Sequence, residues 1–558
     1  MSKPHRIAGA IFVAAVCLEL FFVHMLPLSL SIDSYGYIAF AADPFADTAP
    51  VVRTPGYPLL IAATGSLTLD TLLPLVLLQA LLVTSVPVLC FYALAPAGQI
   101  AGVAGATLAA AYAYPYTMTL QVMTEATYMS GLMAAVLIFA IYVHRRRLPW
   151  LAGSLALIGL IAEIRPSANL LFPCVAAGAA LVAMQHRSRR HVMHALLALA
   201  VTAGAFAGRP LVTDRNSANI TPFFVWHWLS QCRLVDGGGI TSNPDEPDST
   251  SCVSLDNGPA TRELFSAVRQ MLAERRGRYD ELASGRDFRG APSGLRAGFT
   301  TYDAASIDRL VDDLVTNTRE NPHRGPAMVT YLWEHIGLEE TGRLLRAAIG
   351  ETLMAHPRIV REKLVELLDL LILDPRLLAL EMPRTPNALH DNVYWHFVPR
   401  SLQDRPVLDQ FPAGPGAYSQ WLVGLDRLTG VDPEAKELSG RFPDTWDESW
   451  RALRDQANYT TVGLFVGNWL TRVLGETLFL MSVVSIVPAL MTSLWPVAAV
   501  AFVASWGLTA ASFVVQDNYR HIMMHVPLLF LVHALAMAGV GNALRRPRSP
   551  GPLEPPPP

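Results

Sequence analysis

Long apolar stretches dominate this chain, and they constrain its fold more than any other feature. A helical run of roughly 18 to 25 apolar residues matches the thickness of a bilayer core. The chain has 558 residues, of which 52% are hydrophobic and only 16% are charged. The sequence therefore predicts an all-α polytopic membrane protein with about ten transmembrane helices. The candidate spans lie near residues 7–29, 71–94, 99–118, 126–143, 149–165, 168–185, 192–208, 462–491, 494–514 and 522–542.

Basic clusters between the spans test this count, because Lys and Arg are retained on the cytoplasmic side of a membrane. If the amino terminus is cytoplasmic, ten spans place every cluster on that side. Both termini are then cytoplasmic, and the bacterial inner (plasma) membrane is the expected location. The clusters form no basic stripe with interleaved aromatic residues, so we expect no nucleic-acid partner. They are Lys3 with Arg6, Arg145 to Arg147, Arg187 with Arg189 and Arg190, and Arg545 and Arg546 with Arg548.

This topology divides the chain into four parts. Residues 1–208 form an amino-terminal transmembrane module with surface helices near 34–70. Its first span is expected to be retained rather than cleaved as a signal peptide, because no clear small-x-small site ends it. Residues 209–461 have ordinary soluble composition and form a large, mostly helical extracytoplasmic domain, in which apolar residues recur at three and four over 341–357 and 358–373. Residues 462–542 carry the last spans, and 543–558 form a Pro-rich cytoplasmic tail.

Two cysteines fall in the predicted extracytoplasmic domain. An oxidising compartment would let Cys232 and Cys252 form a disulfide. Closing a loop of that size could contribute roughly 3 kcal/mol to stability. The alternative is two independent thiols.

Charged and aromatic residues gather where the spans reach the extracytoplasmic face. Asp33, Tyr35 and Tyr37 follow the first span, and Arg53 precedes a rigid Thr-Pro-Gly-Tyr-Pro turn and a short apolar stretch, 59–67, which is too short to span. A helix lying along the membrane surface is the expected structure there. Similar turns carry Met123-Thr124-Glu125, Glu163 with Arg165-Pro166, and Asp517-Asn518-Tyr519-Arg520. Ionisable groups at span ends are costly unless they are paired or solvated, so we expect these four turns to converge on a functional site.

The order of these motifs resembles that of bacterial membrane glycosyltransferases of the GT-C class, which include protein mannosyltransferases and the lipid A aminoarabinose transferase. The resemblance rests on an early extracytoplasmic Asp, then Arg-x-Pro-Gly-Tyr-Pro-Leu at 53–59, a Thr-Glu pair opening a span, an Arg-Pro turn, and an Arg/Tyr pair before the last span. That last pair reads Tyr519-Arg520 here, whereas Arg-Tyr is expected. The resemblance covers the seven amino-terminal spans and the closing hairpin, and not residues 209–461.

The resemblance implies an inverting glycosyltransferase that uses a polyprenyl-phosphate sugar at the extracytoplasmic face. The acceptor would be a cell-envelope glycan, a lipid or a protein. Asp33 would be the general base that takes the proton of the acceptor hydroxyl, and Glu125 the second catalytic acid. Whether a divalent cation is required stays open; Glu125 would be a ligand for one.

The remaining site residues would bind the donor or shape the substrate site. Arginine suits phosphate because its guanidinium offers paired donors. Arg53, Arg165 and Arg520, with Tyr519, are therefore assigned to the donor phosphate and lipid. Tyr35, Tyr57 and Asp517 are assigned to substrate shaping. For the tyrosines, packing or anchoring at the membrane interface is the competing interpretation.

Two other functions fit the same charges. A carrier or flippase for a lipid-linked intermediate would use them as a translocation path, although they lie on one face and no inverted pair of broken helices is evident. A non-catalytic scaffold for envelope assembly is the third interpretation. Production of free polyprenyl phosphate distinguishes a transferase from both.

Overall fold

The computed structural model describes residues 3–25, 54–66, 72–120, 122–207, 252–274, 336–362, 478–515 and 524–545. It also describes shorter pieces and isolated positions, among them Tyr37 and Cys232. These residues are mostly helical, as the sequence predicts.

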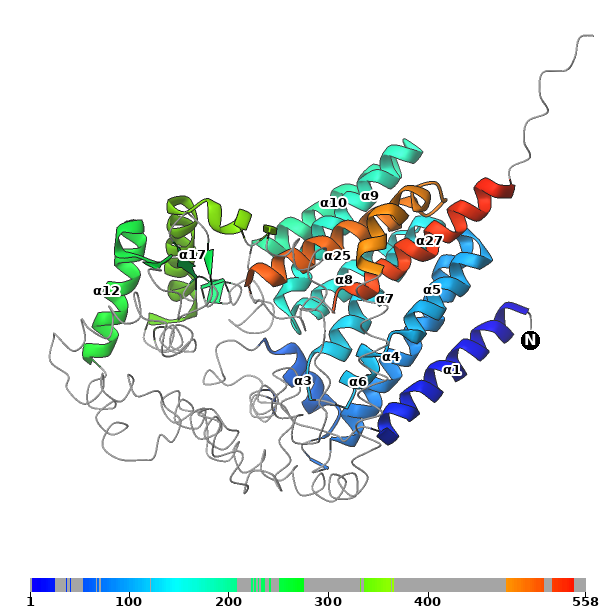
Figure 1. The fold of residues 1–558 in the computed structure, drawn as a ribbon, viewed down its shortest axis with the longest axis horizontal. Helices are drawn as coiled ribbons and strands as arrows, with labels where there is room; N and C mark the ends of the chain where they lie inside the picture. Colours follow the sequence, from blue (N-terminus) through cyan, green and yellow to red (C-terminus); the bar gives the residue numbers. More distant parts are fainter. Residues whose placement is uncertain are drawn as a thin grey trace, which may run out of the picture.

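Apolar helices pack side by side to form a bundle, which Figure 1 shows on the side nearer the amino terminus. Along the chain, two short helices and two 3-10 turns connect these helices. They are α3 (Gly56–Ala63), α6 (Tyr114–Met118), η1 (Ala95–Ala97) and η2 (Pro166–Leu170). The bundle helices are α1 (Lys3–Met25), α4 (Leu73–Leu94), α5 (Gln99–Ala111), α7 (Glu125–Arg145), α8 (Leu148–Ala162), α9 (Leu171–His186), α10 (Arg189–Phe206), a helix over 478–489, α25 (Trp495–Val515) and α27 (Val526–Arg545).

Six helices in the described part of the chain are long and apolar enough to cross a membrane. Length and composition therefore support a helical membrane protein. The six spans are Pro4–His24, Leu73–Ala97, Glu125–Arg145, Pro166–His186, Trp495–Ser512 and Val526–Leu544.

Each of the ten predicted runs overlaps a described helix, but some helices are shorter than the runs. The run predicted over 99–118 is divided, because α5 ends at Ala111 and Tyr112 takes an extended conformation. Pro115 explains the break, since its ring cannot donate to the carbonyl of Ala111 and would clash with it in a continuous helix. Of the long run at 462–491, only the helix from 478 lies within the described residues.

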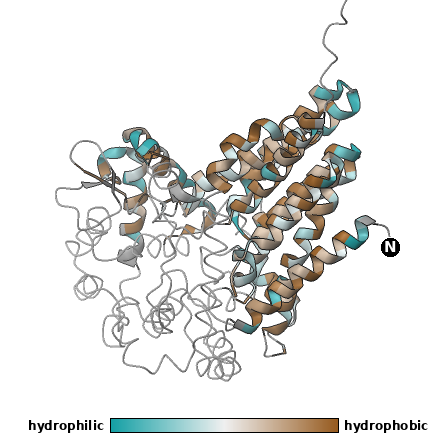
Figure 2. Cartoon of the chain, turned by 45° about the vertical axis from the view of Figure 1, so that its right-hand side comes forward, coloured by the Kyte–Doolittle hydropathy of each residue, from teal (hydrophilic) through white to brown (hydrophobic). Residues whose placement is uncertain are grey.

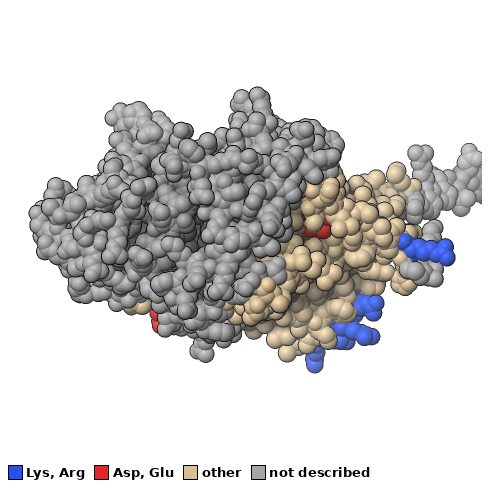
Figure 3. Space-filling model, turned by 90° about the horizontal axis from the view of Figure 1, so that it is seen from below, with Lys and Arg blue, Asp and Glu red and all other residues tan. Residues whose placement is uncertain are grey.

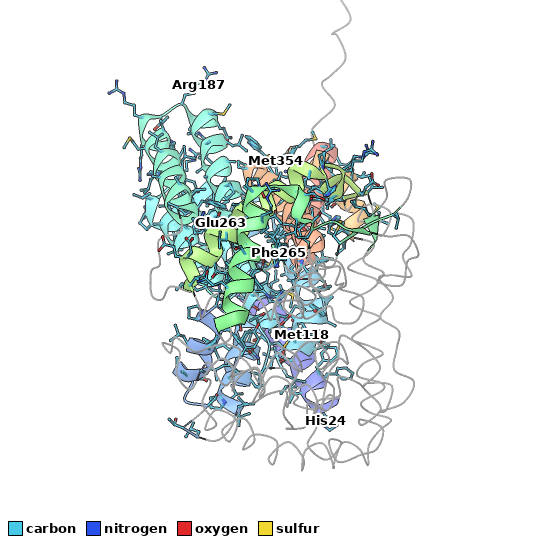
Figure 4. All side chains as sticks on the ribbon, turned by 90° about the vertical axis from the view of Figure 1, so that its left-hand side faces the viewer. His24, Met118, Arg187, Glu263, Phe265 and Met354 are labelled. Carbon is cyan, nitrogen blue, oxygen red and sulfur yellow. A yellow bond between two sulfur atoms is a disulfide. The ribbon has the colours of Figure 1, made fainter. Side chains whose placement is uncertain are left out.

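Apolar side chains cover the outside of the bundle as well as its interior (Figure 2). Leu77 and Leu81 on α4 are 60% and 58% exposed, and Leu160 on α8 is 66% exposed. Contact between these side chains and lipid acyl chains costs no free energy, whereas their exposure to water is unfavourable. The Lys and Arg side chains of the bundle that are visible in Figure 3 gather at one end. His24 and Arg187 mark the two opposite ends in Figure 4.

The described part of 209–461 has its own core. Helices α12 (Pro259–Glu274) and α17 (Leu338–Ala355) pack against each other and against the 3-10 turn η3 (Leu255–Asn257). α17 agrees with the helix predicted over 341–357. Cys232 and Cys252 form a disulfide with their Cα atoms 5.4 Å apart, in agreement with the predicted pairing. Both sulfurs lie in a buried apolar cluster with Leu264 and Leu345.

Three two-residue strands accompany this core, which the sequence did not predict. They are β1 (Arg233–Leu234), β2 (Ile240–Thr241) and β3 (Thr250–Ser251), antiparallel in the order β2-β1-β3. Pairs this short carry no readable alternation of apolar and polar residues. The disulfide lies beside them, because the Cys252 N–H donates to the Cys232 carbonyl at 3.0 Å.

A carboxylate from α17 caps the amino terminus of α12. Glu351 accepts hydrogen bonds from the backbone N–H groups of Ala260 and Thr261 at 2.8 and 2.7 Å, and from the Thr261 hydroxyl at 3.0 Å. Burial raises the pKa of Glu351, but the three hydrogen bonds outweigh it, so the pKa is lowered overall. The charged carboxylate therefore stabilises the contact between α12 and α17.

Replacing Glu351 by Gln is expected to loosen the start of α12. A lost cap of this kind costs about 1 to 2 kcal/mol, so exchange of the first α12 amides should accelerate about tenfold in hydrogen-exchange mass spectrometry. Because the folded pKa is depressed, the wild-type stabilisation is present above the unfolded pKa and is lost as pH falls through the folded pKa. Glu263→Gln, in an exposed ion pair with Arg343, is the control and should change little. Equal exchange in wild type and Glu351→Gln would contradict the cap.

Candidate functional site

The predicted site residues divide into those that the structure describes and those that it does not. Glu125, Arg165 and Tyr57 are described. The others lie outside the described residues, so their assignments stay predictions. They are Asp33, Tyr35, Arg53, Asp517, Tyr519 and Arg520.

The structure brings Glu125 and Arg165 together. Glu125 is the first residue of α7 and is completely buried, and its Oε1 lies 3.4 Å from Nη2 of Arg165. Arg165 lies on the turn between α8 and η2, with an extended backbone and a side chain that is 14% exposed. A carboxylate in the first turn of a helix is also stabilised by the helix dipole. Arg165 is thus the member of this pair that a ligand can approach.

Aromatic and polar groups surround the guanidinium of Arg165. Its Cζ lies 5.6 Å from the centroid of the Tyr128 ring, and its Nη1 donates to Sδ of Met524. The Tyr128 hydroxyl is 2.9 Å from Oγ of Ser167 and 3.3 Å from Nε2 of His525. A cation packed on an aromatic ring and beside a carboxylate is held in one orientation. The turn at 163–167 and the start of α27 therefore meet at the amino end of α7.

Two hydrogen bonds to backbone carbonyls hold the start of the short helix α3 against the same turn. The Gly56 N–H donates to the Glu163 carbonyl at 2.8 Å, and the Thr54 hydroxyl donates to the Ile164 carbonyl at 3.0 Å. A Cβ on Gly56 would lie 2.5 Å from the Glu163 carbonyl carbon and oxygen. Glycine is therefore needed here for close approach, which explains the Pro-Gly-Tyr-Pro turn that the sequence shows at 55–58.

Replacing Gly56 by Ala is expected to push α3 away from the turn that carries Arg165. The atoms nearest to the new Cβ, the Glu163 carbonyl carbon and oxygen and the Ile164 nitrogen, are all backbone atoms, so none can rotate aside. We expect a loss of about 1 to 3 kcal/mol in stability and a parallel loss of activity. Thermal unfolding in detergent measures the first. Gly153→Ala, at a helical position with ordinary contact to Ile138, is the matched control. Wild-type melting of Gly56→Ala would contradict this packing.

Tyr57 lies behind Glu125 and not on an open surface. Its side chain is completely buried, and its ring meets that of Tyr37 edge to face at 5.1 Å. Burial raises the pKa of Tyr57, and the nearby Tyr37 and Glu125 raise it further. In this structure Tyr57 supports the site from within, which agrees with the packing interpretation more than with contact to substrate.

A buried chain of hydrogen bonds leads from Tyr57 across the bundle to α1. The Tyr57 hydroxyl donates to Oε1 of Gln79 at 2.8 Å, and Nε2 of Gln79 donates to the Thr119 carbonyl at 2.9 Å. The Thr119 hydroxyl then lies 2.6 Å from Oε1 of Glu19. This chain of hydrogen bonds fixes α1, α3 and α4 relative to Thr119, which directly follows α6. It therefore positions the residues that lead into Glu125.

Glu19 is the functional candidate that sequence reasoning missed. It lies in the first candidate span, is 4% exposed, and its Oε2 has no hydrogen-bond partner in the described part of the structure. An acid inside a transmembrane helix is a functional candidate by default, and that signal was readable in the run 7–29. Tyr128 and His525 carried weaker signals, because their contacts join segments almost 400 residues apart.

A small pocket of about 20 Å³ lies beside the amino-terminal half of α7. Ser130 and Tyr112 carry hydroxyls in its lining, which is otherwise mainly apolar. Its lining includes Val83, Tyr112, Met129, Met133 and Phe530. Met129 is one helical turn beyond Glu125, so the pocket begins near the ion pair.

Among the residues that the structure describes, no three or more His, Cys, Asp or Glu side chains are placed to hold a metal ion. Comparison with protein-family models, curated proteins and solved structures finds no match to this chain.

Proposed function

We propose that this protein transfers a sugar from a polyprenyl-phosphate donor to an acceptor on the extracytoplasmic face of the bacterial inner membrane, by an inverting GT-C-type mechanism. The observation that carries the proposal is the buried pair of Glu125 and Arg165 at one end of an apolar bundle. The proposed topology has ten spans and cytoplasmic termini, with 209–461 outside.

The place of the pair suits a lipid-linked donor. α7 has 21 residues and is therefore about 30 Å long, close to the thickness of the hydrocarbon core. Glu125 begins this helix, and Arg145 to Arg147 follow at its other end. If the basic cluster is cytoplasmic, Glu125 and Arg165 lie at the outer boundary of the membrane. The phosphate of a lipid donor lies at that depth.

Arg165 is suited to the leaving phosphate. Its guanidinium is oriented by Glu125 and by the Tyr128 ring, and it keeps 14% exposure. A pre-oriented cation stabilises the charge that develops on a departing phosphate. In the proposal, Arg53 and Arg520 add to this charge, and Tyr519 helps to hold the lipid.

In the proposal, the isoprenoid chain of the donor lies along the exposed apolar outer surface of the bundle, where Leu77 and Leu81 on α4 are 60% and 58% exposed. An isoprenoid chain has no polar group, so it buries apolar surface there without leaving a hydrogen bond unmade. The pocket beside α7, at about 20 Å³, is the size of a single water molecule and is not the place of the lipid chain.

The proposed reaction balances without an added cofactor. Asp33 takes the proton of the acceptor hydroxyl as its oxygen attacks the anomeric carbon, and the bond from that carbon to the phosphate oxygen breaks. Attack opposite the leaving group inverts the anomeric centre. The electron pair leaves with the polyprenyl phosphate, whose charge the arginines neutralise.

The test is incubation of purified full-length protein with polyprenyl-phosphate sugars and membrane-extracted acceptors. Transfer releases free polyprenyl phosphate and a glycosylated acceptor, both detected by mass spectrometry. A flippase would move the donor between leaflets with its sugar still attached, and a scaffold would do neither. Arg165→Ala should abolish most of the release, whereas Arg187→Gln, at the opposite end of the bundle (Figure 4), should not. Movement of the intact donor between leaflets, or neither movement nor release, would overturn the proposal.

A further inference from the structure

Three histidines meet at the end of the bundle opposite Glu125. His186 ends α9, and His191 and His194 lie in the first two turns of α10. The ring centroids of His186 and His191 are 5.4 Å apart, and those of His191 and His194 are 5.8 Å apart. The Tyr142 hydroxyl lies 3.3 Å from Nδ1 of His194, which joins α7 to the cluster. We call these three residues the histidine cluster.

His191 is buried at the centre of the cluster without a hydrogen bond to either ring nitrogen. Only 8% of the residue is exposed, and Nδ1 and Nε2 both lack a partner among the described residues. Burying two unsatisfied nitrogens costs free energy, and a native structure normally supplies a ligand or water to such groups. The pattern therefore indicates a missing partner.

Among the described residues, every charged or titratable group that acts on His191 from the neighbouring elements is basic or itself a histidine. These groups are Arg146 after α7, Arg190 on α10, and the two other histidines. Arg146 and Arg190 are exposed, so a ligand can approach both side chains. α10 also begins here, with the partial positive charge of its amino terminus. A partner for His191 must therefore be an anion that accepts several hydrogen bonds.

We propose that the histidine cluster binds a phosphate group, and that the physiological source is an anionic lipid headgroup of the cytoplasmic leaflet. Phosphate oxygens accept from imidazole and guanidinium donors together. Val192 and Met193 beside His191 are 46% and 64% exposed, so apolar side chains flank the cluster as they would beside acyl chains. Basic residues at this boundary are attracted to anionic lipids. This inference does not depend on the proposed transferase activity.

A metal site is the competing interpretation of three histidines. Among the described residues, no three or more His, Cys, Asp or Glu side chains are placed to hold a metal ion. Two nearby arginines also repel a cation. The geometry therefore favours an anion.

The experiment places the full-length protein in nanodiscs of phosphatidylcholine with increasing phosphatidylglycerol and counts retained lipids by native mass spectrometry. Wild type should retain phosphatidylglycerol. His191→Leu should retain it about tenfold more weakly, because a charge-assisted hydrogen bond is lost. His144→Leu removes an exposed histidine at the same end of the bundle and should match wild type. Arg146→Gln, on an exposed side chain, repeats the test if His191→Leu does not fold.

Separate arms distinguish the sources of the phosphate group. Inorganic phosphate added at millimolar concentration to pure phosphatidylcholine discs should leave the mass and stability of the protein unchanged if the ligand is a lipid. Stabilisation by free phosphate that His191→Leu abolishes would keep the phosphate site and overturn its lipid source. Equal retention by wild type and both variants, or zinc binding that His191→Leu abolishes, would overturn the proposal.

Discussion

Replacing Asp33 by Asn is expected to abolish release of free polyprenyl phosphate while leaving expression and membrane insertion intact. The amide has nearly the same size as the carboxylate but cannot take the proton of the acceptor hydroxyl. General-base catalysis contributes roughly 10²- to 10⁴-fold to rate, so turnover should fall to near background. The measurement is product release per mole of purified protein, with donor binding determined in parallel. Donor affinity should stay within about threefold of wild type, because Asp33 acts on the acceptor.

Asp47→Asn is the matched control for this prediction. It makes the same chemical change in the same predicted extracytoplasmic segment, which is 30–70. Turnover should therefore be retained in Asp47→Asn and lost in Asp33→Asn. Near-wild-type turnover in Asp33→Asn would remove Asp33 from the mechanism. Loss of donor binding in that variant would reassign it to positioning.

The helical fold was predictable because few backbone structures can satisfy their hydrogen bonds inside a bilayer. A run such as 126–143 must satisfy its backbone hydrogen bonds internally, and α7 occupies that run with only small shifts at its ends. Boundaries set by single residues were harder to predict. α5 ends at Ala111 because of a proline that lies four residues further on, inside a segment that the apolar run was predicted to include. The small strands near the disulfide are each only two residues long, too short to carry a readable alternation of apolar and polar residues.

Part of the site was predictable because its residues stand at span ends. Glu125 and Arg165 were both expected at one face, and the structure places them 3.4 Å apart. Their surroundings were not predictable from the sequence. Tyr128 and His525 meet only after α27 packs against α7, and nothing in a single sequence indicates that pairing. The buried position of Tyr57 was not predictable for the same reason, because its hydroxyl bonds to Gln79 in another helix.

Breaking the pair of Glu125 and Arg165 is expected to give the other large effect, and the two partners should fail differently. Arg165→Ala removes the cation proposed to hold the donor phosphate, so donor affinity should fall by roughly 1.5 to 3 kcal/mol, which is about 10- to 100-fold. Glu125→Gln keeps that cation and should change the pH dependence of turnover more than donor affinity. Donor titration and pH–rate profiles of both variants measure the difference. Ser167→Ala is the control, because it removes a neighbouring hydroxyl and neither charge.

Each single variant also leaves a buried group without its partner, so stability must be separated from function. Removing one member of a buried pair typically costs about 3 to 5 kcal/mol, because the other charge stays desolvated. Arg165 keeps only 14% exposure, so Glu125→Gln should lower the melting temperature. Adding Arg165→Met to it should restore much of that loss of stability, because no charge then stays buried, while turnover is lost with the Arg165 cation. If Arg165→Ala and Glu125→Gln melt as wild type and keep full donor affinity and turnover, the pair is an ordinary membrane-boundary contact, and the proposed site loses its main support.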